Sequence, residues 1–182
     1  MYEIYSNAQH DQWRYALGKD GPRKLLTIGL NPSTATQEKS DTTVAKVEGV
    51  ARRHGFNGFA MLNLYPIRST NFNALPFDAD SQAYSENLNQ IESFVTTESN
   101  PVIWAAWGES IHARNYFLTA ALELFSRLGK YHPTWQHLGT LTKSGHPRHP
   151  SRLNYNWAFF ELDAQSYRLS LRAKQRRNIY RH

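Results

Sequence analysis

A polar loop with a rigid amide follows the apolar run at residues 25–30. In this loop Pro32 forces Asn31 into an extended conformation, and the hydroxyl of Ser33 is able to cap a following turn. The loop therefore suits two roles: an ordinary junction between a strand and a helix, or an amide held rigidly beside free backbone N–H groups. Downstream, Asp41 is suited to capping a helix or to acting as a carboxylate base, and its place before two threonines favours the cap.

A second polar loop follows the apolar run at residues 59–64 and includes Asn63, Tyr65 and Arg68. An amide at the end of an apolar strand costs free energy unless it is hydrogen-bonded. The amide of Asn63 is able to read the Watson–Crick edge of a pyrimidine, and the alternative is a structural amide bonded to nearby backbone. We assign Tyr65 to base binding. Arg68 is a candidate for contact with phosphate, and the alternative is an exposed arginine.

A third polar loop, Lys143–Leu153, is rich in His, Pro and Arg. Its two histidines, His146 and His149, stand three positions apart, which is a spacing that places two metal ligands on one face of a helix. The prolines that follow each histidine exclude a helix here, and no third ligand is apparent, so we expect no metal. A rigid loop that also carries Arg148, Arg152 and a serine hydroxyl fits a clamp on a nucleic-acid backbone.

The elements that must position these loops are short strands alternating with helices. Four apolar runs, each bounded by turn residues, are expected to be buried strands: residues 25–30, 59–64, 102–107 and, with the weakest pattern, 134–138. Three stretches of helical periodicity lie between them: residues 44–51, 86–95 and 111–128. This alternation predicts an α/β fold with three α/β/α layers around a central, mostly parallel, four-stranded sheet. Ligand sites in such sheets lie at the carboxyl ends of the strands, where the polar loops meet.

The composition predicts one folded domain with a basic end. Of the 182 residues, 40% are hydrophobic and 20% are charged, which is enough apolar material for a packed core. The net charge of +6 arises entirely after Asp163, where six Lys or Arg residues and no acidic ones occur. We therefore expect a single domain over residues 1–163 and a basic tail over residues 164–182. Such a tail suits nucleic-acid binding or keeps a chain in solution.

Cysteine is absent from the sequence, which excludes disulfides, thiol nucleophiles, zinc–thiolate sites and iron–sulfur clusters. No apolar run approaches the roughly 18 residues that a membrane-spanning helix needs, and no signal peptide opens the chain. We expect a cytoplasmic protein with no membrane contact and no cofactor.

Taken in chain order, these motifs resemble those of the uracil-DNA glycosylase superfamily over about residues 24–155. The matching segments are Gly29-Leu30-Asn31-Pro32, Asn63, the apolar run that ends in Trp107-Gly108, and His149-Pro150-Ser151. More narrowly, most of the chain resembles a bacterial and phage family of unknown function. That narrower family supplies no activity, so the activity is inferred from the glycosylase resemblance, which also implies a uracil-DNA-glycosylase-like fold.

The resemblance implies a role for each matching residue. Asn31 would position or polarise the attacking water, and Asn63 would hydrogen-bond the flipped base. His149 would stabilise the negative charge of the departing base. Ser151 would grip a phosphate, and Leu153 would enter the base stack as a wedge.

Three departures from the superfamily's pattern shape the expected reaction. Asn31 stands where many relatives have Asp and leaves no obvious general base, so Asp41 is our candidate for that role. Arg152 replaces the Pro that is usual in the wedge loop, which alters that loop's geometry. Ser33 stands where the uracil-specific branch has a Tyr that closes the pocket, which leaves room beside C5 of a pyrimidine. No lysine occupies a motif position, so we expect hydrolysis without a lyase step.

The sequence therefore predicts a monofunctional DNA glycosylase. It would hydrolyse the N-glycosidic bond of a flipped-out, 5-substituted pyrimidine and leave an abasic site, with a role in antiphage defence. Duplex DNA would be its partner, and we expect a monomer. The alternatives are a glycosylase that repairs uracil or mismatches, a catalytically inactive DNA-binding module of the same fold, and an enzyme that acts on free nucleosides or nucleotides.

Overall fold

Four parallel strands form the centre of the sheet, and they coincide with the four predicted runs. They are β3 (Lys24–Gly29), β4 (Gly58–Asn63), β5 (Val102–Ala105) and β6 (Thr134–Leu138). The computed structural model describes residues 1–179, without the side chains of residue 72 and residues 176–179. Helices cover both faces of these strands, which explains why β3 and β4 are near-continuous apolar runs.

The sheet has seven strands, so the prediction of a four-stranded, mostly parallel sheet is wrong for the sheet as a whole. Its order is β1-β2-β4-β3-β5-β6-β7, and three of its six pairings are antiparallel. The hairpin of β1 (Ile4–Ala8) and β2 (Trp13–Lys19) extends the sheet beyond β4, and β7 (Phe159–Glu161) extends it beyond β6. None of the three is a continuous apolar run of the length sought: β2 contains Arg14 and Lys19, β1 contains Ser6 and Asn7, and β7 has only three residues.

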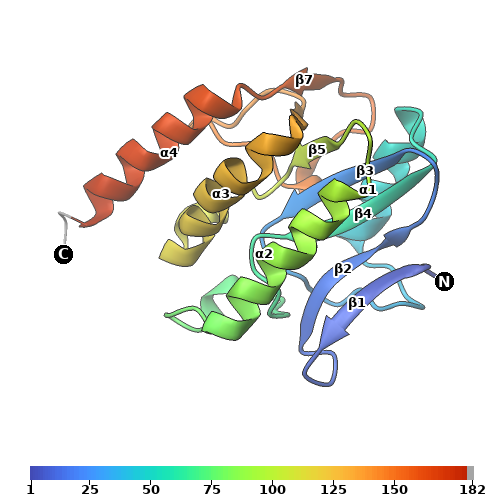
Figure 1. Ribbon diagram of the computed structural model, residues 1–182, viewed down its shortest axis with the longest axis horizontal. Helices are drawn as coiled ribbons and strands as arrows, with labels where there is room; N and C mark the ends of the chain where they lie inside the picture. The colour runs from blue at the N-terminus through green and yellow to red at the C-terminus, as the bar shows by residue number, and fades with distance from the viewer. Residues whose placement is uncertain (180–182) are drawn as a thin grey trace.

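Helices form a layer on each face of the sheet, as predicted. One layer is α1 (Thr42–Arg53), whose Val44, Val47 and Val50 pack on the sheet. The other contains α2 (Ser81–Thr96), α3 (Asn115–Leu128) and α4 (Ala164–Ile179), which lie on one face in Figure 1. The crossover through α1 leads from β3 to β4, whereas the crossover through α3 leads from β5 to β6 on the opposite side. The connections therefore diverge between β3 and β5, and a crevice at their carboxyl ends is the expected ligand site.

The basic segment after Asp163 is part of the folded layer as far as the structure describes it. Helix α4 packs through the buried Tyr167 and Leu171, which belong to the same apolar cluster as α3. Of the six basic residues, Arg181 and the side chains of Arg176 and Arg177 lie outside the described part. Within residues 1–179, no helix combines the length and apolar character that a membrane crossing requires.

Candidate functional site

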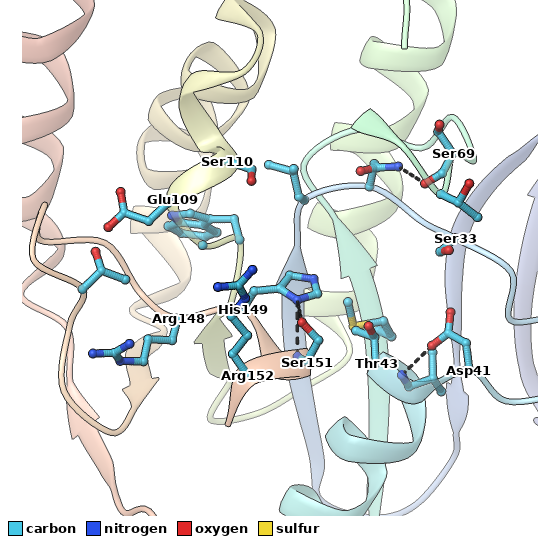
Figure 2. A pocket seen from close by; sticks show the side chains of 18 of the residues that line it. Ser33, Asp41, Thr43, Ser69, Glu109, Ser110, Arg148, His149, Ser151 and Arg152 are labelled. Carbon is cyan, nitrogen blue, oxygen red and sulfur yellow. Dashed lines mark hydrogen bonds between the residues drawn. The ribbon is translucent and has the colours of Figure 1, made fainter. Parts of the chain in front are cut away.

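A pocket of about 820 Å³ lies at the carboxyl ends of the parallel strands, where the sequence predicts a ligand site. The loops after β3, β4, β5 and β6 all contribute to its lining, together with the start of α1. Figure 2 shows Ser33 and Asp41 on one side, Glu109 and Arg148 on the other, and His149 between them. The volume falls within the roughly 300–1,000 Å³ that is typical of small-molecule sites.

Asn31 lines this pocket, and its amide orientation is fixed by the surrounding backbone. Its Nδ2 donates to the carbonyl oxygen of Ser69 at 2.9 Å and to that of Pro32 at 3.1 Å. Its Oδ1 accepts no hydrogen bond from the described residues. Because both amide protons are used by the backbone, the side chain presents an acceptor to the pocket, which suits the holding of a water molecule.

The loop that carries Asn31 is braced from outside the pocket by Arg68. The two Nη atoms of Arg68 donate to the carbonyl oxygens of Ser33 and Ala35, both at 2.8 Å, and to Tyr5 and Asp11 at 2.8–3.1 Å. These bonds occupy both Nη atoms, whereas Nε is buried without a partner among the described residues, and Arg68 does not line the pocket. The prediction that Arg68 contacts phosphate is therefore wrong; Arg68 instead holds the half-buried Ser33 at the wall of the pocket.

Asp41 is the N-cap of α1, as its position in the sequence favours. Its Oδ1 accepts the backbone N–H of Val44 at 2.9 Å, and its Oδ2 accepts that of Ala35 at 3.2 Å. The carboxylate also lines the pocket, facing His149 closely enough to oppose the fall in that histidine's pKa. Its role as a general base stays a prediction, since both oxygens already accept backbone hydrogen bonds.

His149 is held in one tautomer by the turn that follows it. Its Nδ1 accepts the backbone N–H of Ser151 at 3.3 Å and lies 2.9 Å from the hydroxyl of the same residue. In the neutral ring the proton must therefore be on Nε2. Burial lowers the pKa of His149, although the Asp41 carboxylate partly offsets this, so the ring is neutral at pH 7. His149 thus offers a neutral Nε2–H donor from the pocket wall.

The turn at Trp107-Gly108 supports the third polar loop, Lys143–Leu153, which is called the histidine loop from here on. Gly108 has a φ of +74°, and a Cβ on it would lie 3.1 Å from the Cβ of His149, so glycine is required. Its N–H donates to the carbonyl oxygen of Pro147 at 3.1 Å. Trp107 donates from Nε1 to the hydroxyl of Tyr167 on α4 at 2.9 Å. The Tyr167 hydroxyl lies 2.7 Å from Nδ1 of the fully buried His146.

The four DNA-binding candidates of the histidine loop occupy different positions. Ser151 and Arg152 are exposed at the rim of the pocket. Arg148 also lines the pocket, but its Nε donates to the carbonyl oxygen of Thr140 at 2.8 Å. Leu153 is only 6% exposed and packs with α1, because the chain turns inward after Arg152. The structure therefore contradicts the expectation that Leu153 protrudes as a wedge.

The two base-binding candidates of the second loop also differ. Tyr65 lies on the opposite face of the sheet, where its hydroxyl accepts the N–H of Asp80 at 2.8 Å and its ring packs on Tyr116. The prediction that Tyr65 binds a base is therefore wrong. Asn63 is fully buried beside Gly29 on the pocket side of the sheet, and neither its Oδ1 nor its Nδ2 has a partner among the described residues. Its role in base binding stays a prediction.

Sequence reasoning missed Arg14, a pocket residue on β2 that is only 1% exposed. Its Nη1 donates to the carbonyl oxygen of Ala35 at 3.1 Å, and its Nε has no partner among the described residues. The available signal was an arginine between the apolar Trp13 and Tyr15, which is an unusual place for a charge. Across the described residues, no three acidic or histidine side chains gather as a metal site would require.

The fold and the site together define an α/β protein with a polar ligand pocket at the carboxyl edge of a parallel sheet core. The chain belongs to the family described as protein of unknown function DUF1643, whose profile matches residues 14–151. The matched segment begins at Arg14 and ends at Ser151, so it contains every residue that lines the pocket except Arg152. No curated protein and no solved structure matches the chain.

Proposed function

We propose that the protein is a monofunctional DNA glycosylase that releases a flipped-out, 5-substituted pyrimidine from duplex DNA. The observation that carries the proposal is the placement of two complementary groups in one pocket: the Oδ1 acceptor of Asn31 and the neutral Nε2–H donor of His149. Hydrolysis of an N-glycosidic bond needs an acceptor that places a water and a donor where negative charge develops on the base. These two side chains supply both.

The size of the pocket and its small wall residue support a bulky base. The 820 Å³ volume exceeds what an unsubstituted pyrimidine ring fills, and Ser33 contributes little side-chain volume at the wall. A base that carries a hydroxymethyl or glycosylated hydroxymethyl group at C5 fits this space. Such bases occur in phage genomes, so excision would damage invading DNA selectively, and we propose antiphage defence in the cytoplasm as the role.

The rim of the pocket supports contact with a nucleic-acid backbone. Lys143, Arg148 and Arg152 line the pocket, and none of them forms an ion pair within the described part of the chain. Cations without an acidic partner at the entrance suit phosphate binding, which positions a duplex without reading its sequence. Arg152, exposed beside the buried Leu153, is the side chain that this loop offers for insertion into the stack. We propose that the protein binds DNA and acts on it as a monomer.

A panel of duplex oligonucleotides tests the proposal. Each duplex would contain one uracil, mismatched thymine, 5-hydroxymethylcytosine or glucosylated 5-hydroxymethylcytosine, and abasic sites would be read out as alkali-labile breaks. We expect cleavage at the 5-substituted cytosines. Efficient release of uracil alone would replace the defence role with repair, and binding without any base release would leave a DNA-binding module.

Ser33→Tyr tests the specificity within the same panel. A tyrosine ring at this wall would fill the space beside C5, so we expect release of the glucosylated base to fall by about tenfold or more while release of any smaller base is retained. Ser33→Ala is the matched control and should leave the preference unchanged. An equal loss on all substrates would show that Ser33 does not shape the pocket beside C5.

A further inference from the structure

Arg14 is a buried cation that no acidic side chain neutralises. It is 1% exposed, and no carboxylate among the described residues lies within ion-pair distance of its guanidinium. Among the described residues, Nη1 alone has a partner, the carbonyl oxygen of Ala35, while Nε is buried with none. A buried charge without a counter-ion is costly, and such groups are normally paired. Because Arg14 lines the pocket, a ligand is able to supply the missing partner.

The charges around Arg14 act in opposite directions, and none of them forms an ion pair with it among the described residues. Arg68 lies close enough to repel Arg14, whereas the Asp41 and Asp11 carboxylates attract it from beyond ion-pair distance. Burial and the Arg68 charge lower the pKa of Arg14 to about 10, which still leaves the guanidinium charged at neutral pH. Arg14 therefore places a charged guanidinium at the inner wall of the pocket.

Further unpaired polar atoms lie on the same face of the sheet. The amide of Asn63 and the hydroxyl of Thr27 are fully buried and have no partners among the described residues. A Cβ on Gly29 would lie 2.5 Å from the terminal carbon of Met61 and 2.9 Å from Oδ1 of Asn63, so the tip of Met61 adjoins the Asn63 amide. Met61 lines the pocket and is an adaptable side chain. A planar polar ligand that displaced this tip would reach the unpaired Asn63 amide from a pocket that Arg14 also lines.

We propose that Arg14 binds the negative charge of the departing pyrimidine base, as a second electrophilic residue beside His149. This inference rests on the proposed glycosylase function. In the reaction the C1′–N1 bond breaks and its electron pair remains on the base, where it spreads over N1 and the ring carbonyl oxygen. The water oxygen bonds to C1′, and the proton that this water loses is finally taken up by the released base. Arg14 binds the base during the interval in which it is an anion.

The proposal explains how a cytosine-type base leaves. The electron-donating amino group makes the cytosine anion a poorer leaving group than the uracil anion, so a neutral histidine donor provides only part of the stabilisation required. A full charge in a pocket that excludes bulk water interacts more strongly with a developing anion than the same charge would in water. Arg14 therefore matches the substrate class that Ser33 admits.

Binding of free pyrimidines to the intact protein tests the proposal without any DNA. Calorimetric titrations at neutral pH would compare 5-nitrouracil, which is ionised there, with neutral uracil and with inorganic phosphate. We expect the wild type to bind the 5-nitrouracil anion about tenfold or more tightly than uracil, as a charge-assisted hydrogen bond implies. Arg14→Met should reduce this ratio to about one, and the control Arg52→Met, at an exposed arginine of α1 that does not line this pocket, should preserve it.

The outcomes separate this proposal from its alternatives. Equal binding of anion and neutral base by the wild type would overturn it, whatever the variants do. Phosphate binding that is lost in Arg14→Met, without a preference for the pyrimidine anion, would assign Arg14 to phosphate and likewise overturn it. Preference for the anion in a protein that cleaves no DNA would refute the proposed function and leave the anion site standing. DNA cleavage with no preference for the anion would support the proposed function and refute the role of Arg14 in binding the anion.

Thermal unfolding distinguishes a ligand-binding arginine from a structural one. Replacing a buried, unpaired charge by an apolar side chain of similar length is expected to be neutral or stabilising. The ligand-free Arg14→Met protein should therefore melt at or above the wild-type temperature. A clear fall in melting temperature would show that the bond to Ala35 makes Arg14 structural, contrary to the proposal.

Discussion

The two faces of the sheet differ in how their buried polar atoms are satisfied. Under α2 and α3, the hydroxyl of Tyr65 pairs with Asp80, and the indole N–H of Trp107 pairs with Tyr167. On this face, Oδ1 of Asn87 has no partner among the described residues. On the face under α1, Arg14, Thr27 and Asn63 all keep such atoms, and Arg14 lines the pocket, whereas Asn87 does not. Native proteins pair most buried polar groups, so unpaired ones require a reason. On the pocket side of the sheet, we attribute them to a ligand.

The largest expected effect concerns the pocket, and its absence would contradict the assignment of the face under α1 to ligand binding. Asn31→Ala and His149→Ala should each slow base release by about 10²-fold or more, because each removes a group that acts in the transition state. Single-turnover rates on the cleaved duplex measure the effect, and far-UV circular dichroism checks the fold. Asn89→Ala, on the exposed face of α2, is the matched control. Variants that retain full activity would remove the pocket residues from catalysis.

The second effect concerns the face under α2 and α3, and it is a loss of folding stability at acidic pH. Burial, and then the Lys174 and His112 charges, lower the pKa of His146 from 6.5 to about 4. Between these values the unfolded chain binds a proton that the folded chain does not, so stability is complete above about pH 6.5 and falls as the pH drops towards 4. We expect a loss on the order of 3 kcal/mol, measured by urea unfolding across this range. His146→Gln should show a flatter pH dependence; an unchanged slope would contradict the assignment.

A smaller effect should follow from weakening the brace behind the Asn31 loop. Asp11→Asn removes the negative partner of Arg68, and we expect it to destabilise the protein by about 1–2 kcal/mol, as the loss of a charged hydrogen bond does. Asp20→Asn is the control, because its exposed pair with Lys24 should contribute less than about 1 kcal/mol. Chemical denaturation compares the two variants. Equal effects would show that Arg68 needs no counter-ion.

The smallest effect concerns the basic helix α4. Deleting residues 164–182 would remove the buried Tyr167 and Leu171, so a single substitution is the cleaner test. Arg172 is exposed, and Arg172→Gln should reduce the slope of log K for DNA against log salt by about one if it contacts a phosphate. Arg23→Gln, before β3 and thus at the opposite edge of the sheet, should leave the slope unchanged. Identical slopes in all three proteins would exclude Arg172 from the interface.

The part of the fold that the sequence predicts is the part buried on both faces. Strands β3 to β6 appear as apolar runs, and their polar loops converge because parallel strands end at one edge. The hairpin of β1 and β2 lacks such a run, so the sequence pattern does not indicate that Arg14 lies at the pocket. The sequence does not predict that Tyr65 and Leu153 point away from the pocket, because the register of the strands and the geometry of the turns decide where each side chain points. The partners of Arg68 lie up to 63 positions away and only tertiary structure brings them together.

The ion pair between Asp11 and Arg68 limits how far the chain can be truncated. The family match covers residues 14–151, which contain almost the whole pocket lining, yet Asp11 lies before this segment and Tyr167 lies after it. A fragment limited to the matched residues would leave Arg68 without its carboxylate and Trp107 without its hydroxyl partner, and would also lose β1 and β7 from the sheet edges. The segment that identifies the family is therefore smaller than the unit that folds.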